Sequence, residues 1–292
     1  MLRLADGLLK WLSRRPLWLL QGLGAALGWV VWGLSPAYRR RLRDNAALAG
    51  VSARDRRRSV AEAGRMTLEL PRLWLRDRDA PVPDPVRWEG AELIEAALGR
   101  PGGLLILTPH LGSFEVAAHA YAQRFGQRQP MTVLYRPARQ AWLRAMEEVA
   151  RERPGLSSAP ATLAGVRHLL RALKQGGTVA LLPDQVPPQG LGVWAPFFGR
   201  PAYTMTLAAR LARQTGATVT LCWCERLPGG QGHVVRMSAL PEPLPDPEGL
   251  DDEAWALQAA TVVNRVMEAL ILRCPGQYLW GYHRYKQPRG TP

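Results

Sequence analysis

A histidine and a glutamate stand five positions apart where a predicted strand gives way to a predicted helix. His110 closely follows the apolar strand expected over 104–108, and Glu115 lies in the first turn of the helix expected over 113–125. A carboxylate at a helix start can reach an imidazole at a strand end, fix its tautomer and stabilise its charged form. The other ring nitrogen is then able to accept a proton. His110 is therefore predicted to be a catalytic base, and Glu115 the carboxylate that orients it.

The sequence shows no nucleophile motif beside this pair. Ser113 lies between the two residues, but it is outside a G-x-S-x-G nucleophile elbow and is better explained as a helix N-cap. A substrate hydroxyl can take the place of a serine and attack a thioester directly. An isolated His-x4-Glu is more often a structural histidine beside a capping glutamate. The pair therefore needs support from the rest of the chain.

The elements around the pair alternate between strands and helices. Apolar runs bounded by glycine and proline predict strands, and apolar residues at helical spacing predict helices. The expected strands cover 104–108, 131–136, 178–184, 218–227 and 233–240, and the expected helices cover 91–98, 113–125, 138–151, 163–174, 205–214 and 251–272. The last two strands alternate enough to suggest an antiparallel edge pair. This order predicts an α/β fold, a mostly parallel mixed sheet flanked by helices.

Polar turns follow two of the predicted strands. Functional sites of parallel α/β sheets lie just beyond the carboxyl ends of the strands. The segment TPHLGSFE follows the strand over 104–108, and PDQ closes the strand over 178–184. Both turns are therefore candidates for the functional edge of the sheet.

The N-terminal segment is predicted to associate with a membrane. Residues 17–34 carry no charge and would form a helix of about 27 Å, close to the hydrocarbon thickness of a bilayer. Arginines flank it on both sides, and tryptophans stand near its ends. A cleaved signal peptide fits poorly. A spanning helix and a helix dipping into one leaflet fit equally well, and a buried core helix is the remaining interpretation.

The domain organisation follows from this segment. We expect a membrane anchor helix with basic flanks over 1–43 and a single α/β domain over 44–292. The start of that domain, 44–80, is expected to be helical with an interruption at Pro71, and the proline-rich stretch 80–86 to be an extended linker.

Composition limits the class of partner. The formal charge of +14 favours nucleic acid, an anionic membrane surface or an acidic protein. Eleven tryptophans favour the membrane, because tryptophan is enriched at membrane interfaces. The cysteines Cys222, Cys224 and Cys274 show neither zinc-ligand nor disulfide spacing, and they suit reduced core positions in a reducing compartment.

Three segments together resemble one family. TPHLGSFE, the stretch LLPDQVPPQGLGVWAPFFGRPAYTMTLAARLA and the C-terminal QYLWGYHRYK resemble the late acyltransferases of lipid A biosynthesis, within the lysophospholipid acyltransferase superfamily. The resemblance covers nearly the whole chain and implies a fold of the glycerol-phosphate acyltransferase type. The HX4E motif alone is shared by many lipid acyltransferases. Together with the D-Q, P-F-F-G and W-x-x-H-R segments, it points much more narrowly to this family. Phe114 stands where relatives commonly carry tryptophan.

The resemblance implies a reaction and its partners. His110 would be the general base on the hydroxyl of a 3-hydroxyacyl chain of the acceptor, a Kdo-lipid IVA precursor, and Glu115 would hold the histidine. The donor would be acyl carrier protein, whose acidic surface suits a basic enzyme. Backbone amides at the start of the helix with Glu115 would bind the oxyanion. The resemblance implies no metal or cofactor, and it places the protein in the bacterial inner membrane, on the cytoplasmic face.

Further polar residues near strand ends are candidates for substrate binding. Arg136, Arg167 and Arg200 would clamp the phosphates of the acceptor, although a solvated surface charge is an equal interpretation for each. Asp184 and Gln185 would bind the sugar or, in the slightly favoured interpretation, brace the loops of the active site.

Two other functions compete with lipid A acylation. The first is an acyltransferase of the same superfamily with another acceptor, such as a lysophospholipid, a glycolipid or an acylated amino acid, because no motif names the acceptor pocket. The second is a basic protein of the membrane surface without catalysis. Nucleic-acid binding is disfavoured because the sequence carries no nucleic-acid-binding motif.

Overall fold

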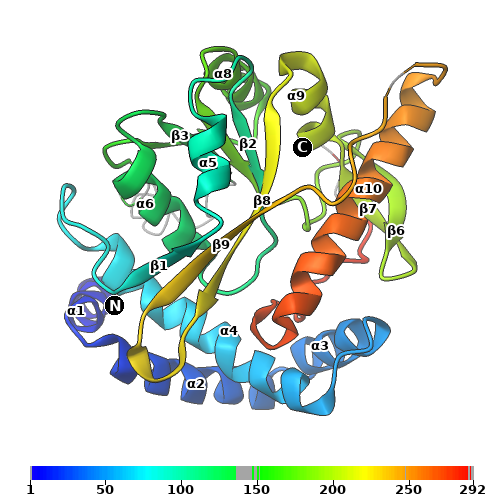
Figure 1. The fold of residues 1–292 in the computed structure, drawn as a ribbon. Coiled ribbons are helices and arrows are strands. Elements are labelled where there is room, and N and C mark those ends of the chain that lie inside the picture. Colours follow the sequence, from blue (N-terminus) through cyan, green and yellow to red (C-terminus); the bar gives the residue numbers. More distant parts are fainter. Residues whose placement is uncertain are drawn as a thin grey trace.

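A seven-stranded sheet forms the centre of the computed structural model, which describes residues 2–135, 147, 150, 152–246, 248–288 and 290, with only the backbone of 2–6 (Figure 1). The strand order is β1-β9-β8-β2-β5-β3-β4. The bounds are β1 Val86–Glu89, β2 Leu104–Leu107, β3 Met131–Tyr135, β4 Leu156–Pro160, β5 Thr178–Leu181, β8 Thr218–Arg226 and β9 His233–Ala239. The helix expected over 138–151 lies almost wholly outside the described residues.

The centre of the sheet is parallel. Strand β2 pairs in parallel with β5 on one side and β8 on the other, and β3 joins β5 to β4 in the same direction. Strands β2 and β5 are buried along their whole length, which explains their continuous apolar sequence. The predicted fold class, a mostly parallel mixed sheet flanked by helices, is confirmed.

The strands β8 and β9 form the predicted antiparallel pair, but this pair is not the edge of the sheet. The short strand β1 pairs in parallel with β9 and forms the edge instead. Four residues directly after a proline-rich stretch carry too weak a pattern for prediction. A separate antiparallel ribbon of β6 (Gly192–Phe197) and β7 (Arg200–Met205) was also not predicted. Its prolines are typical of such edge strands.

Helices cover both faces of the sheet (Figure 1). Leu104 and Ile106 point to the face covered by α5 and α6, and Leu105 and Leu107 point to the face covered by α8, α9 and α10. The bounds of these helices are α5 Glu92–Ala97, α6 Phe114–Phe125, α8 Leu163–Lys174, α9 Leu207–Thr215 and α10 Asp252–Arg273, with the short 3-10 turns η1 Pro228–Gly230 and η2 Pro275–Gln277.

Four helices precede the sheet and lie along its lower edge in Figure 1. They are α1 Leu2–Ser13, α2 Leu17–Leu34, α3 Pro36–Leu48 and α4 Ala53–Trp74. Pro71 does not interrupt α4, because it lies in the last turn, where the helix ends three residues later. The predicted boundary between the membrane anchor and the α/β domain, at 43/44, falls inside α3. Among the described helices, α2 is long and apolar enough to cross a membrane by length and composition.

Candidate active site

His110 is held by a buried carboxylate. It lies three residues beyond β2, and its ring nitrogen Nδ1 is 2.7 Å from Oδ1 of Asp184. The backbone N–H of His110 donates to Oδ2 of the same carboxylate at 3.0 Å. Asp184 follows β5, the neighbour of β2, and its side chain is 1% exposed. The two predicted turns are therefore joined at the carboxyl ends of adjacent parallel strands.

The second ring nitrogen of His110 faces an amide. Nε2 lies 3.0 Å from Nε2 of Gln185. When Nδ1–H donates to the carboxylate of Asp184, Nε2 carries the lone pair and accepts from the Gln185 amide. The arrangement thus presents a basic imidazole nitrogen whose tautomer is fixed by its partners.

The electrostatics of Asp184 depend on that histidine. Burial opposes ionisation of this carboxyl most strongly, but the charge of His110 and its hydrogen bonds hold the pKa of Asp184 below the ordinary value. Behind it, burial first and then the charge of Asp184 raise the pKa of Tyr278 well above its ordinary value, so that Tyr278 remains a neutral phenol. The anion of Asp184 is thus favoured by His110 and, to a smaller extent, by the positive charge of Arg284.

The loop after His110 is fixed to the end of β8 and to the turn η2. The N–H of Ser113 donates to the carbonyl of Cys224 at 2.8 Å, and the N–H of Gly112 donates to the carbonyl of Gln277 at 3.1 Å. Gly112 has a φ of 63°, and a Cβ at this position would overlap the Cys224 carbonyl. Only glycine fits this close approach.

A buried ion cluster stands behind the same loop. The guanidinium of Arg226, at the end of β8, binds Glu69 and Glu62 of α4 at distances of 2.7 to 2.8 Å. It also donates to the carbonyl of Gly112 at 3.3 Å. Burial opposes ionisation of Glu69, but Arg226 lowers the pKa of this carboxyl to about 2. The cluster ties α4 to the loop that carries His110.

The C-terminal segment closes the site from the other side. The hydroxyl of Tyr282 accepts the N–H of Val186 at 3.0 Å, directly after Asp184 and Gln185. Gln277 binds both the N–H and the carbonyl of Arg226 through its side chain. The segment therefore fixes both loops of the site. Apart from its aromatic and polar residues, no local pattern in the sequence indicates this role.

His110 and Gln185 line a large cavity of about 1500 Å³. One part is apolar and lies between α6 and the sheet. Its walls include Trp74, Trp88, Ile106, Tyr121, Ala180, Cys222 and Met237. Another part runs along the β6–β7 ribbon to Arg210 and Asp252. The basic nitrogen thus lies on the wall of a cavity whose apolar part has the character of a hydrocarbon site.

The structure brings most of the predicted residues together. Glu115 lines the same cavity as His110, in the first turn of α6. The carboxylate found on the His110 ring, however, is that of Asp184. Asp184 and Gln185 both contact the His110 ring, and whether they bind the sugar or brace the loops stays a prediction. Ser113 occupies the N-cap position, but its buried hydroxyl makes no capping hydrogen bond.

Of the three predicted arginines, two lie away from the cavity wall and one lies outside the described residues. Arg167 is exposed on α8 and is absent from the cavity wall, although its neighbour Val166 lines it. Arg200 is exposed and stacks 4.7 Å from the centre of the Tyr285 ring. Arg136 lies outside the described residues. A role of these arginines in substrate binding stays a prediction.

The described part of the chain contains no cluster of three histidine, cysteine or acidic side chains that could hold a metal ion. The three cysteines are buried and free. Burial raises the pKa of Cys222 to about 12, so this thiol on the cavity wall is protonated.

Comparisons with known proteins point to one family. Residues 4–287 match the family model described as bacterial lipid A biosynthesis acyltransferase. The chain is 30% identical over 211 residues to the lipid A biosynthesis lauroyltransferase of Escherichia coli K12, a match that covers 70% of this chain and 65% of that protein, a little under two thirds of its length. It is 27% identical over 240 residues to the palmitoleoyltransferase of the same bacterium, with 80% and 74% covered.

Proposed function

Since the chain belongs to the bacterial lipid A biosynthesis acyltransferase family, we propose that it transfers a fatty-acyl chain from acyl carrier protein to a lipid A precursor. The acceptor would be the hydroxyl of a 3-hydroxyacyl chain on Kdo-lipid IVA. The observation that carries this proposal is the imidazole of His110, fixed by Asp184 on the wall of a large apolar cavity. Such a site suits a reaction between two lipid-bearing substrates.

His110 would act as general base and then as general acid. Its Nε2 accepts the proton of the acceptor hydroxyl while the hydroxyl oxygen attacks the thioester carbonyl carbon. The tetrahedral intermediate then collapses, the carbon–sulfur bond breaks, and the imidazolium returns the proton to the departing thiolate. The amide of Gln185 occupies the side of Nε2 from which the hydroxyl must approach. Gln185 therefore moves aside or orients the hydroxyl when the acceptor binds.

We assign different tasks to the two carboxylates. Asp184 holds Nδ1 and so fixes the tautomer that leaves Nε2 basic. Glu115 lines the cavity beside His110 and, as a second negative charge, favours the imidazolium through space. The sequence-based prediction gave both tasks to Glu115.

The oxyanion of the intermediate needs hydrogen-bond donors. The first N–H groups of an α-helix have no partner within the helix, and the helix dipole favours negative charge there. Helix α6 begins at Phe114, four residues after the base. We propose that these amides stabilise the oxyanion, in a role worth about 3 kcal/mol for each donor.

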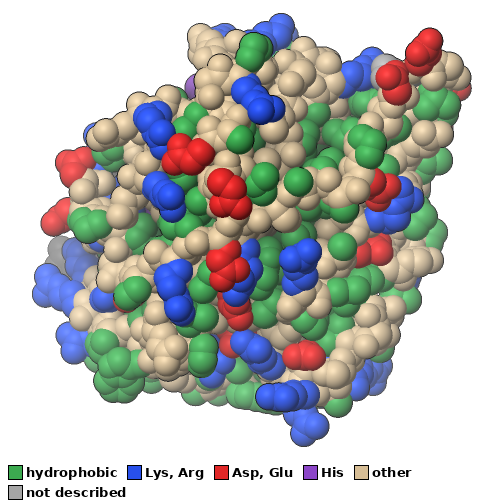
Figure 2. All heavy atoms as spheres, in the orientation of Figure 1, with side chains coloured by type: hydrophobic (Ala, Val, Ile, Leu, Met, Phe, Trp, Pro, Cys, Tyr) green, Lys and Arg blue, Asp and Glu red, His purple; other side chains and the backbone are tan. Residues whose placement is uncertain are grey.

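The donor chain would lie in the apolar part of the cavity, between α6 and the sheet. Burial of a methylene group contributes about 0.8 kcal/mol, so a long acyl chain can be held by this wall alone. The carrier protein would dock outside by charge, because acyl carrier proteins are acidic and this chain has a formal charge of +14. Figure 2 shows many lysine and arginine side chains on one face.

The location that fits these substrates is the cytoplasmic face of the bacterial inner membrane. The apolar helix α2 with basic residues at both ends supports membrane association. The acceptor is a lipid, and the donor is a cytosolic protein.

The acceptor is tested by mass spectrometry. Purified protein in detergent is incubated with lauroyl-carrier protein and either tetra-acylated Kdo-lipid IVA or lysophosphatidylethanolamine. We expect the mass of one acyl chain to be added to Kdo-lipid IVA, and the product to be absent with His110→Ala. Acylation of the lysophospholipid alone would contradict the proposed acceptor and favour another acyltransferase of the superfamily. Vesicle binding without acylation of either lipid would favour a non-catalytic membrane protein.

A further inference from the structure

Helix α2 contacts the rest of the protein through a narrow stripe and turns its large apolar side chains outward. The stripe comprises Leu17, Leu20, Gln21, Gly24 and Gly28. The exposed side comprises Trp18, Leu23, Leu27, Trp29, Val30, Val31 and Leu34, of which Leu34 is 80% exposed. A surface helix of a water-soluble protein has the opposite arrangement, with its apolar stripe toward the core. The outer face of α2 is therefore suited to an apolar phase.

Glycines fix α2 to α4 along their lengths. A Cβ on Gly24 would lie 2.6 Å from the Cα of Arg65, and a Cβ on Gly28 or Gly64 would overlap backbone of the opposite helix. The two helices lie side by side at the lower edge of the molecule (Figure 1). Because backbone meets backbone, the two helices keep one relative position.

Gln21 fixes α2 to the sheet as well. Its amide donates to the carbonyl of Leu227 at 2.9 Å, and its side-chain oxygen accepts the N–H of Gly230 at 3.0 Å. Both partners lie at the turn between β8 and β9. A polar side chain that would weaken a free spanning helix thus has two partners in the folded protein.

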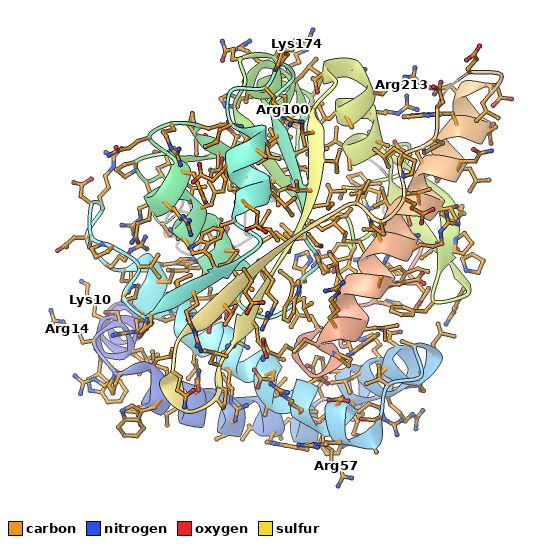
Figure 3. All side chains as sticks on the ribbon, in the orientation of Figure 1. Lys10, Arg14, Arg57, Arg100, Lys174 and Arg213 are labelled. Atoms are coloured by element: carbon orange, nitrogen blue, oxygen red, sulfur yellow. The ribbon has the colours of Figure 1, made fainter. Side chains whose placement is uncertain are left out.

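The charge of α4 excludes a crossing orientation of α2. Arg54, Arg57 and Arg58 are exposed on α4, and Arg57 projects at the lower edge in Figure 3. Gly24, near the middle of α2, meets Arg65, and Gly28 meets Val60. The two helices are therefore antiparallel, and the middle of α4 lies beside the middle of α2. If α2 crossed a bilayer, α4 would accompany it and carry the ion pair of Arg65 and Glu62 into the hydrocarbon, where charged side chains are costly. In the membrane plane, the exposed arginines of α4 reach lipid phosphates instead.

The basic residues around α2 agree with an in-plane position. Lys10 of α1 and Arg14, directly after α1, project at one end (Figure 3), and Arg40 and Arg43 are exposed on α3 at the other. A crossing helix would place one of these groups on each side of the membrane, against the excess of basic residues on the cytoplasmic side. Hydrophobic and basic side chains lie together at the lower left of Figure 2, over α1 and the start of α2.

We propose that α1 and α2 form a monotopic docking face that binds one leaflet of an anionic membrane, with α2 parallel to the membrane plane. The inference rests on the proposed function, which requires a lipid acceptor, and it adds how the enzyme meets that lipid. The cavity is lined by Leu70 and Trp74 near the end of α4. An acceptor in the same leaflet therefore approaches the cavity along the docked helices.

Cysteine labelling distinguishes the two orientations. Gly7→Cys on α1 and Ala47→Cys on α3 place exposed thiols before and after α2, and Gly7 shares the helix face of Lys10 and Arg14. The unchanged chain is the control, because its three cysteines are buried. Each variant is treated with a membrane-impermeant maleimide in spheroplasts of a bacterial host, before and after lysis.

We expect neither variant to react in intact spheroplasts and both to react after lysis. Reaction of one variant alone in intact spheroplasts would mean that α2 crosses the membrane and would overturn the proposal. The labelling does not depend on acyl transfer, so a wrong orientation and a wrong function are detected separately.

Vesicle binding tests whether the docking face of α1 and α2 binds a membrane. The double variant Val30→Glu with Leu34→Glu is compared with Leu257→Glu, which alters an exposed leucine of α10. We expect the double variant to bind vesicles of phosphatidylethanolamine and phosphatidylglycerol at least about tenfold more weakly, and Leu257→Glu to bind as the unchanged protein does. The contradicting result is a dimer of the unchanged protein in detergent that the double variant converts to monomers without weakening vesicle binding. In that case the face is an interface between copies of the chain, and the proposal is contradicted.

Discussion

At the scale of single residues, the chemistry depends on which carboxylate holds His110. Both oxygens of Asp184 bind this residue, one at Nδ1 and one at the backbone N–H. The buried carboxylate therefore fixes both the tautomer and the position of the ring. Glu115 lies on the cavity wall, and we propose that its charge favours the imidazolium.

Replacing Asp184 by asparagine tests this assignment. The asparagine amide can donate to Nδ1 and so favours the wrong tautomer, and we expect kcat to fall by about two to four orders of magnitude with little change in KM. Glu115→Gln should reduce kcat less. Initial rates with saturating acyl-carrier protein measure both. A larger loss for Glu115→Gln than for Asp184→Asn would return the orienting role to Glu115.

Gly112 has the strongest backbone requirement in the site. We expect Gly112→Ala to lower the melting temperature and the activity, because the new Cβ would overlap the Cys224 carbonyl as well as strain a positive φ. Gly99→Ala is the matched control, since Gly99 has a φ of 73° and open space around its Cβ position. Gly99→Ala should lower the free energy of unfolding by only about 1 kcal/mol. Equal melting temperatures of the two variants would show that the contact with Cys224 can be relieved.

At the scale of elements, long apolar segments and capped, periodic segments could be predicted, and short polar ones could not. The observed bounds of α2 and α8 are those expected from the sequence. Helix α8 begins at a capping hydrogen bond from Gly165 N–H to the Thr162 side chain. Strand β4 has the sequence LSSAP, whose pattern is too short and too polar to identify a strand. Its pairing with β3 decides its conformation.

We expect the apolar space between α6 and the sheet to determine which length of acyl chain the enzyme prefers. Ala180 is a small residue of β5 on the cavity wall. We expect Ala180→Phe to shift the preference toward shorter acyl donors, because the ring would fill the space of several methylene groups. The measurement is competition between carrier proteins loaded with acyl chains of different length. Ala180→Ser, of similar volume, should keep the original preference, and an unchanged preference of Ala180→Phe would place the chain elsewhere.

At the scale of the whole molecule, contacts between distant parts of the chain complete the site. Arg226 binds Glu62 across 164 positions, and Val186 binds Tyr282 across 96. No motif in the sequence indicates such pairs, because each residue type is common and the partner is set by the fold. The strand-end turns with His110 and Asp184 could be predicted. The orienting role of Asp184 could not, since it depends on which strands are neighbours.

The pair of Glu69 and Arg226 predicts an acid-sensitive stability. The pKa of Glu69 falls from an ordinary 4.5 to about 2 in the folded protein. The pair therefore contributes its full stabilisation of the folded state above pH 4.5, and this stabilisation is lost as the pH falls toward 2. We expect Glu69→Gln to lower the free energy of unfolding by about 3 kcal/mol at pH 7, and this difference to shrink below pH 4.5. Urea unfolding across this range measures it, and a constant difference would contradict the assigned pKa.

The rate of acyl transfer by two histidine variants tests the central claim most directly. His110→Gln removes the base from the cavity wall, whereas His168→Gln changes an exposed histidine of α8 that does not line the cavity. Transfer from radiolabelled lauroyl-carrier protein to Kdo-lipid IVA is measured for both, with circular dichroism as the check on folding. We predict that His110→Gln falls to the background rate while His168→Gln keeps the rate of the unchanged protein. A folded His110→Gln protein that transfers the acyl chain at the original rate would contradict the account.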